Sequence, residues 1–138
     1  MGTISGGALV ADYATGGFYD EMFAQERDGA VLHLRLNRPN KRNAVNDALL
    51  QRLEQLLNGL DAHTGCVLLS GEGQHFCAGL DLSELAERSV FDGVLRSRMW
   101  HAALDKLQYA PVPVVAVLHG AVVGGGLELA CSAHIRVA

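Results

Sequence analysis

Two glycine-marked turns, each placed after an apolar run, are the features that most restrict how this 138-residue chain can fold. The first turn spans residues 76–82 and comes after the apolar run 66–69. The second spans residues 119–128, follows the apolar run 114–118 and holds three consecutive glycines. Short runs that are apolar on both faces are typical of strands covered on each side, as in a parallel sheet. The two turns therefore predict buried strands that end in tight loops.

The other periodicities place helices between such strands. Residues 31–36 put leucines on one face and Val31, His33 and Arg35 on the other, which predicts a half-buried strand. From Asn46 onwards leucines follow the helical period, with Asn46 or Asp47 in position to cap the first turn. Further helices are expected near 82–83, over 91–109 and over 127–133, and a last strand over 135–137. The alternation predicts an α/β fold with right-handed crossovers.

The length fits a single domain, because domains commonly hold roughly 100 to 200 residues. Residues 1–23 are rich in glycine and small side chains and show no sustained period. We interpret them as a flexible N-terminal extension. Residues 24–138 then form the core domain.

Composition restricts the class of function. A net charge of −4 gives little electrostatic support for a nucleic-acid partner. Three cysteines, an odd number without paired metal-ligand spacing, argue against a disulfide framework and a metal site, and favour a reducing compartment. No apolar run approaches the roughly 20 residues that span a bilayer, and the N-terminus carries no charged leader with an apolar core. We expect a cytoplasmic protein with no membrane partner.

The chemistry lies in the two turns. A glycine triplet that opens a helix leaves unpaired N–H groups at the positive end of the helix dipole. Two such donors that converge from different turns make an oxyanion hole, which would stabilise an enolate or thioester oxygen. No Lys-Ser or Lys-Thr pair follows the triplet and no Gly-x-Gly-x-x-Gly is present, which disfavours a phosphate loop and a dinucleotide site. Glu128 lies within the first turn of the expected helix and is able to face the same pocket.

Three motifs in this order resemble the enoyl-CoA hydratase/isomerase (crotonase) superfamily. They are Asn-Arg-Pro-x-x-x-Asn-Ala from residue 37, Phe-Cys-Ala-Gly-Leu-Asp-Leu from residue 76, and His-Gly-x-x-x-Gly-Gly-Gly-Leu-Glu-Leu-Ala from residue 119. The resemblance covers roughly residues 26–138. It implies a ββα spiral core and an acyl-CoA thioester as substrate, with coenzyme A as part of the substrate and no separate cofactor. It also implies a role in fatty acid metabolism.

The resemblance implies specific roles for the motif residues. The two oxyanion-hole amides map onto Leu80 and Gly125, and Glu128 matches the first catalytic glutamate of the hydratases. Contacts with the coenzyme A and acyl parts of the substrate are implied for Lys41, Arg42, Ala44, Ala78, Gly79, Asp81, Leu82, Ser83 and Gly124. Lys41 or Arg42 would contact a phosphate.

Two of these residues also have plain structural interpretations. Asp81 is in position to cap a helix or fix its loop, a role that we favour over that of an acid. A helix glutamate such as Glu128 is most often solvated. Against that, apolar positions at Leu127, Leu129 and Ala130 surround it, so we expect a carboxylate that works as a general acid or base.

The chain departs from the family pattern in two places. Ala133-His134 stand where the family commonly has Cys-Asp, which leaves the local ion-pair partner open. The second catalytic glutamate of the hydratases and the C-terminal trimerisation helices lie beyond the part that matches. We therefore expect a fragment, a split half or a truncated member, without efficient hydratase activity on its own. The complete protein would be a trimer or hexamer.

Glu128 favours the hydration of a 2-enoyl-CoA. An isomerase, a hydrolase, a carbon–carbon lyase and a decarboxylase use the same hole and stay open, as does a non-catalytic acyl-CoA-binding subunit.

Overall fold

The computed structural model describes residues 10–12, 17–85 and 89–138. Across these ranges, seven strands form one sheet in the order of the sequence. The strands are β1 (Val10–Asp12), β2 (Gly17–Tyr19), β3 (Phe23–Asp28), β4 (Val31–Leu36), β5 (Cys66–Gly71), β6 (Val114–Val117) and β7 (Ile135–Val137). The helices are η1 (Pro39–Lys41), α1 (Asp47–Asn58), η2 (Leu82–Glu84), α2 (Val90–Gln108) and α3 (Gly125–Ser132).

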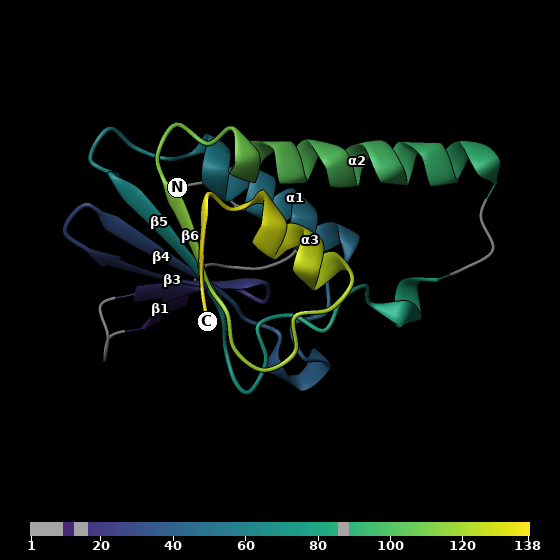
Figure 1. Cartoon of the computed structure of the whole chain (residues 1–138), viewed down its shortest axis with the longest axis horizontal. Helices are drawn as coiled ribbons and strands as arrows, with labels where there is room; N and C mark the ends of the chain where they lie inside the picture. The colour runs from purple at the N-terminus through teal and green to yellow at the C-terminus, as the bar shows by residue number, and fades with distance from the viewer. Residues whose placement is uncertain (1–9, 13–16, 86–88) are drawn as a thin grey trace.

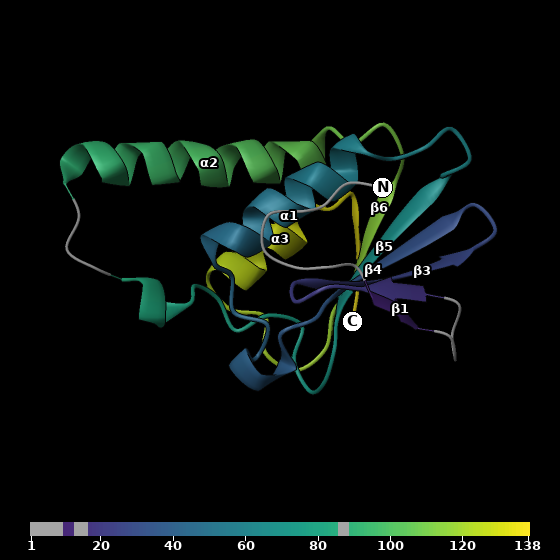
Figure 2. The same ribbon diagram turned by 180° about the vertical axis from the view of Figure 1, so that it is seen from behind.

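The sheet is mixed. Strands β1 to β4 pair antiparallel, and strands β4 to β7 pair parallel. Each parallel pair is connected through one α-helix, as parallel strands require. Helices α1 and α3 are drawn between the sheet and the long helix α2, which contacts both of them (Figure 1 and, from behind, Figure 2).

The core forms where the sheet meets α1. Leu34 and Leu36 of β4 are fully buried, while the alternating residues His33 and Arg35 are partly exposed on the other face. Helix α1 begins after Asn46, whose side chain accepts a hydrogen bond from the N–H of Leu49 (2.8 Å). Its buried leucines, at positions 49, 50, 53 and 57, face this side of the sheet. The capped, amphipathic helix expected from the sequence is therefore confirmed.

Helix α2 is covered along only part of its length. Ala103 and Leu107, near its C-terminal end, are fully buried. At its N-terminal end Val90 is 87% exposed and Phe91 is 70% exposed, and in Figure 1 this end projects past the rest of the molecule. The apolar residues of this half follow the helical period without packing in a core. Along the described part of the chain, no helix is both long and apolar enough to cross a membrane.

The structure describes part of residues 1–23, the segment interpreted from the sequence as a flexible extension. Residues 10–12 and 17–19 are strands of the sheet, and residues 1–9 and 13–16 lie outside the described part. Strand β3, which the sequence did not predict, pairs with β2 on one side and β4 on the other. These strands are three to six residues long, and each pairs antiparallel with its neighbour in the sequence. A boundary of the core domain at residue 24 stays a prediction.

Asp20 connects this region to α1. Its Oδ1 atom accepts hydrogen bonds from the N–H groups of Met22 (2.8 Å) and Phe23 (2.7 Å). Its Oδ2 atom forms an ion pair with Nε of Arg52 on α1 at 2.6 Å. Both side chains are about nine-tenths buried. The ion pair therefore fixes the start of β3 against the helix that covers the sheet.

Replacement of Asp20 by alanine should destabilise the fold strongly. The change would leave the Arg52 guanidinium buried without a partner, and two backbone N–H groups without an acceptor. Breaking one side of a buried ion pair commonly costs about 3 to 5 kcal/mol. The free energy of unfolding in urea measures the effect, and the exposed neighbour Glu21→Ala is the control. Equal stability of the two variants would contradict this account of Asp20.

Candidate active site

The structure brings the three sequence motifs side by side through backbone hydrogen bonds. On one side, the N–H of Cys77 donates to the carbonyl of Ala121 (3.0 Å), and the N–H of Val123 donates to the carbonyl of Cys77 (3.2 Å). On the other side, Val45 donates to the carbonyl of Gly79 (2.7 Å), and the N–H of Asp81 donates to the carbonyl of Val45 (2.8 Å). The 76–82 segment is thus held between the Asn-Ala motif and the glycine triplet.

This pairing determines where the N–H of Leu80 points. Leu80 and Val45 form a parallel bridge, in which Val45 bonds to the two residues that flank Leu80. The N–H of Leu80 itself therefore points away from Val45. Gly125, at the first position of α3, has its N–H outside the hydrogen bonds of the helix. Within the described residues, neither N–H has a backbone or side-chain acceptor.

The two N–H groups lie close together. A Cβ atom built on Gly125 would lie 3.8 Å from the nitrogen of Leu80, and one built on Gly79 would lie 3.8 Å from the nitrogen of Gly125. The turns need glycine to reach this arrangement, because φ is +106° at Gly79 and +53° at Gly124. The structure thus brings together the two donors expected from the sequence.

Both donors open into a pocket of about 290 Å³. Glu128 lines it from α3, and helix α2 forms the opposite wall with Gly93, Arg96, Ser97 and Trp100. These four α2 positions follow a spacing of three and four residues, which places them on one face of the helix. The sequence analysis predicted a helix over 91–109 but did not identify this wall. In the sequence, only the spacing of three and four residues between these positions indicates that they share a face.

Glu128 lies at the rim of the pocket. The expected enclosure by apolar neighbours is wrong, because Leu127 is 51% exposed and Glu128 itself is exposed. Leu129 and Ala130 are buried, but they face the core. Among the described residues, no cation pairs with the Glu128 carboxylate. Glu128 lines the same pocket as Leu80 and Gly125, so its carboxylate is able to exchange a proton with a ligand bound there.

Arg96 fixes the α2 wall to its surroundings. Its Nε atom lies 2.9 Å from Oδ1 of Asp47 at the start of α1, and its Nη2 atom lies 3.4 Å from Oε2 of Glu84 in η2. The Arg96 side chain is 13% exposed. Because η2 begins two residues after Leu80, this ion-pair network connects the wall to the loop that carries one donor.

Asp81 has the structural role that the sequence favoured. It caps η2 by accepting hydrogen bonds from the Ser83 hydroxyl (2.6 Å) and the Ser83 N–H (3.0 Å), and it forms an ion pair with Arg38 at 2.9 Å. The Ser83 hydroxyl, followed by the Arg38 guanidinium, lowers the pKa of Asp81 to about 2. Arg38 also donates to the carbonyl of Ala44.

The remaining expected contact residues lie around this loop without entering the pocket wall. Ala78 donates its N–H to the carbonyl of Arg42 (3.0 Å), which aligns the basic turn with the 76–82 segment. Lys41 and Arg42 are exposed, and neither pairs with a carboxylate of the described residues. Leu82 is 72% exposed. A phosphate contact for the basic turn stays a prediction.

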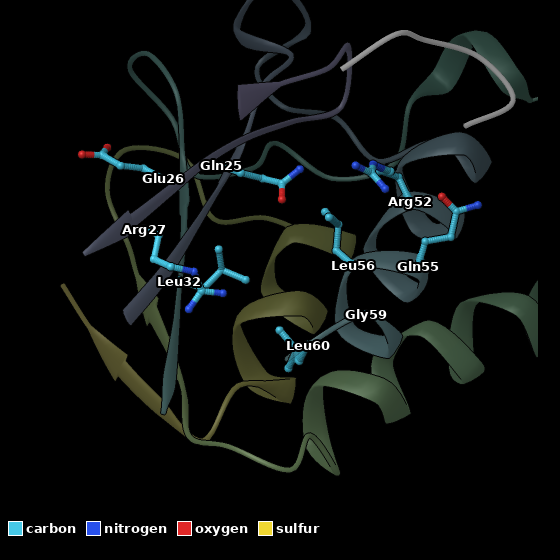
Figure 3. Close-up of a pocket in the computed structure, with 9 residues that line it drawn as sticks. All are labelled: Gln25, Glu26, Arg27, Leu32, Arg52, Gln55, Leu56, Gly59 and Leu60. Carbon is cyan, nitrogen blue, oxygen red and sulfur yellow. The ribbon is translucent and has the colours of Figure 1, made fainter. Parts of the chain in front are cut away.

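A larger hollow of about 430 Å³ lies elsewhere, between the sheet and the outer side of α1 (Figure 3). Leu32, Leu56 and Leu60 lie around it together with charged residues. Its arginines are already engaged, because Arg27 pairs with Asp61 at 3.3 Å and Arg52 pairs with Asp20. Volume alone therefore does not identify the site.

The described residues contain no group of three His, Cys, Asp or Glu side chains placed to hold a metal.

A family model described as enoyl-CoA hydratase/isomerase matches residues 26–138. The chain belongs to the enoyl-CoA hydratase/isomerase family. It is 31% identical over 131 residues to the human mitochondrial Delta(3,5)-Delta(2,4)-dienoyl-CoA isomerase, with 86% of this chain and 40% of that protein covered. It is 38% identical over 109 residues to the probable enoyl-CoA hydratase echA6 of Mycobacterium tuberculosis, with 78% and 43% covered.

Solved structures of the family share the fold. A Rhodopseudomonas palustris protein is 49% identical, with a TM-score of 0.81, and the match covers 94% of this chain and 47% of that one. The chain thus spans less than half the length of these family members. The crotonase fold expected from the motifs is confirmed for the part that is present.

His134, where the chain departs from the family pattern, and Cys77, within the second motif, both have structural roles. His134, at the position of the family aspartate, accepts the Val114 N–H at Nδ1 (2.9 Å), and its Nε2 lies 2.9 Å from the carbonyl of Gln108. These contacts assign the proton to Nε2 and give His134 a hydrogen-bond partner at each ring nitrogen. Cys77 is fully buried, and burial raises the pKa of its thiol. A buried neutral thiol is a poor nucleophile.

The Asp81 ion pair should make stability depend on pH in the acid range. A carboxyl group whose folded pKa lies below its unfolded value stabilises the fold above about pH 4, and this contribution is lost as the pH falls toward 2. The difference in unfolding free energy between the wild type and Asp81→Asn should therefore shrink between pH 4 and pH 2. Ser83→Ala should move the loss to higher pH. Parallel pH curves for wild type and Asp81→Asn would contradict the assignment.

Proposed function

We propose that the protein acts on acyl-CoA thioesters and stabilises a thioester enolate with the N–H groups of Leu80 and Gly125. One observation supports the proposal above the others. Two N–H donors without an acceptor among the described residues open into the same pocket as the Glu128 carboxylate. Paired donors in a partly enclosed site are suited to an oxygen that gains negative charge, and removal of one such donor commonly lowers kcat by about 10² to 10³.

For the hydration of a 2-enoyl-CoA the steps follow from this geometry. The thioester oxygen accepts hydrogen bonds from both N–H groups. Glu128 takes a proton from water as the water oxygen bonds to the β-carbon, and the electron pair of the double bond moves onto the thioester oxygen. Glu128 then returns this proton to the α-carbon as the carbonyl reforms, which restores the Glu128 carboxylate and completes the addition of one water molecule. General acid–base catalysis of this kind commonly contributes about 10²- to 10⁴-fold in rate.

A double-bond isomerase is the second candidate. It is favoured by the match to dienoyl-CoA isomerases from human, mouse and Arabidopsis, which are 31 to 33% identical to this chain. Here the base takes a proton from the α-carbon and returns one further along the acyl chain, while the same two N–H groups hold the enolate oxygen. The roles proposed for Leu80, Gly125 and Glu128 are the same in both reactions.

The proposal extends to the rest of the ligand and to the assembly. The exposed cations of Lys41 and Arg42 lie on the turn that pairs with the 76–82 segment, where they suit phosphates of coenzyme A. The assignment of Ala44, Ala78, Gly79, Asp81, Leu82, Ser83 and Gly124 to ligand contact rests on the family motifs. A homotrimer or hexamer in the cytoplasm, with no membrane or nucleic-acid partner, completes the proposal.

Calorimetric titration with acetyl-CoA tests the substrate class, and we expect binding. Gly125→Pro removes one N–H at a helix position where proline is otherwise tolerated. Gly125→Ala is the matched control, because it adds a Cβ against Trp100 but keeps the N–H. The proline variant should bind more weakly than the alanine variant. No heat with acetyl-CoA, and no competition by another CoA ester, would overturn the proposal.

Glu128→Gln should lower kcat by about two orders of magnitude or more and change the affinity for acyl-CoA little. The amide keeps the shape of the side chain but cannot accept the proton. Turnover is followed by loss of the conjugated enoyl absorbance for hydration, and by its gain when a 3,5-dienoyl-CoA is the substrate. The sign of the change separates the two candidate reactions. Unchanged kcat on the true substrate would assign Glu128 a structural role.

A further inference from the structure

The side chains that form the α2 wall of the pocket differ in size along the helix. Trp100 lies over the start of α3, and a Cβ on Gly125 would lie 2.6 Å from its Cη2 atom and 3.0 Å from its Cζ3 atom. The edge of the indole ring therefore closes the pocket beside the two N–H donors. One and two helical turns towards the N-terminus of α2, the same face carries the small residues Ser97 and Gly93, together with Arg96, whose side chain is held in ion pairs. A Cβ on Gly93 would meet nothing within 4 Å.

We propose that Gly93 and Ser97 form the path of the acyl chain, and that Trp100 blocks the opposite direction. The inference rests on the proposed function, because it takes the thioester oxygen to lie at the N–H groups of Leu80 and Gly125. The pocket that these two residues line runs along α2, so an acyl chain that starts at this point follows the α2 wall. Trp100 closes one direction, and the small side chains leave the other open towards the projecting end of the helix.

The charges along the wall agree with an apolar chain. Arg96, the one cation among the described residues that line the pocket, is engaged by Asp47 and Glu84, so it is a poor partner for a carboxylate on the acyl group. Beyond Gly93, Val90 is 87% exposed one turn further along α2, and Leu82 and Leu85 are 72% and 59% exposed near η2. Apolar side chains are therefore exposed near the Gly93 end of the pocket. Its volume of about 290 Å³ suits part of an acyl-CoA, since sites that enclose whole ligands span roughly 300 to 1,000 Å³.

Gly93→Leu tests the path with little risk to the fold. The site has room for a Cβ, and leucine favours a helix interior more than glycine does. Ala102→Leu is the matched control, because Ala102 is exposed and nine residues along α2 places it on the opposite face. Acetyl-CoA and octanoyl-CoA are titrated calorimetrically into the wild type and both variants.

We expect Gly93→Leu to weaken octanoyl-CoA binding by about tenfold or more, which corresponds to lost burial of about two methylene groups. Acetyl-CoA affinity should change less than about twofold, and Ala102→Leu should affect neither ester. If Gly93→Leu binds octanoyl-CoA as tightly as the wild type, or loses both esters equally, the path is wrong and the proposed function stands. If the wild type binds neither ester, the proposed function itself fails.

Discussion

The parallel bridge between Val45 and Leu80 is the constraint on which the candidate site depends. It uses the N–H and carbonyl of Val45 to hold Gly79 and Asp81, and so turns the N–H of Leu80 away from the pairing. A second bridge, between Cys77 and Val122, holds the same segment against the glycine triplet. The direction of one donor is therefore set by main-chain hydrogen bonds, and no polar side chain is needed at position 80. This explains how an apolar residue can supply a polar group.

The position of the second donor depends on close packing around α3. A Cβ on Gly126 would overlap the carbonyl oxygen of Cys77 and lie 2.8 Å from its Cβ, so glycine there lets α3 approach the 76–82 segment. At the other end of α3, His134 is tied by hydrogen bonds to the start of β6 and the end of α2. Both ends of the helix are thus fixed, and the N–H of Gly125 is held in place before any ligand binds. Such preorganisation is what makes a hydrogen-bond donor effective in catalysis.

Local sequence signals predicted the elements whose causes are local. The leucine period and the Asn46 side chain gave α1 and its cap, and the apolar runs gave β5 and β6. The glycine triplet predicted the start of α3 because consecutive glycines permit the positive φ at Gly124. The donors at Leu80 and Gly125 came from the family motifs, and the structure brings these two residues together at one pocket.

Features set by distant contacts were not predictable in the same way. Strands β1 to β3 are short, and only their antiparallel partners and the buried Asp20 give them a place in the sheet. The exposure of Glu128 depends on which other elements pack over α3. The sequence pattern of α3 alone does not indicate these elements. Trp100 is a second residue whose surroundings depend on distant contacts. It is partly buried against the core, and its ring also lies against a glycine on another helix and borders the pocket, a contact that its position within the expected helix does not indicate. Residues from α2 therefore shape the surroundings of donors that lie on two other segments, which is why the site has to be argued from the fold as a whole.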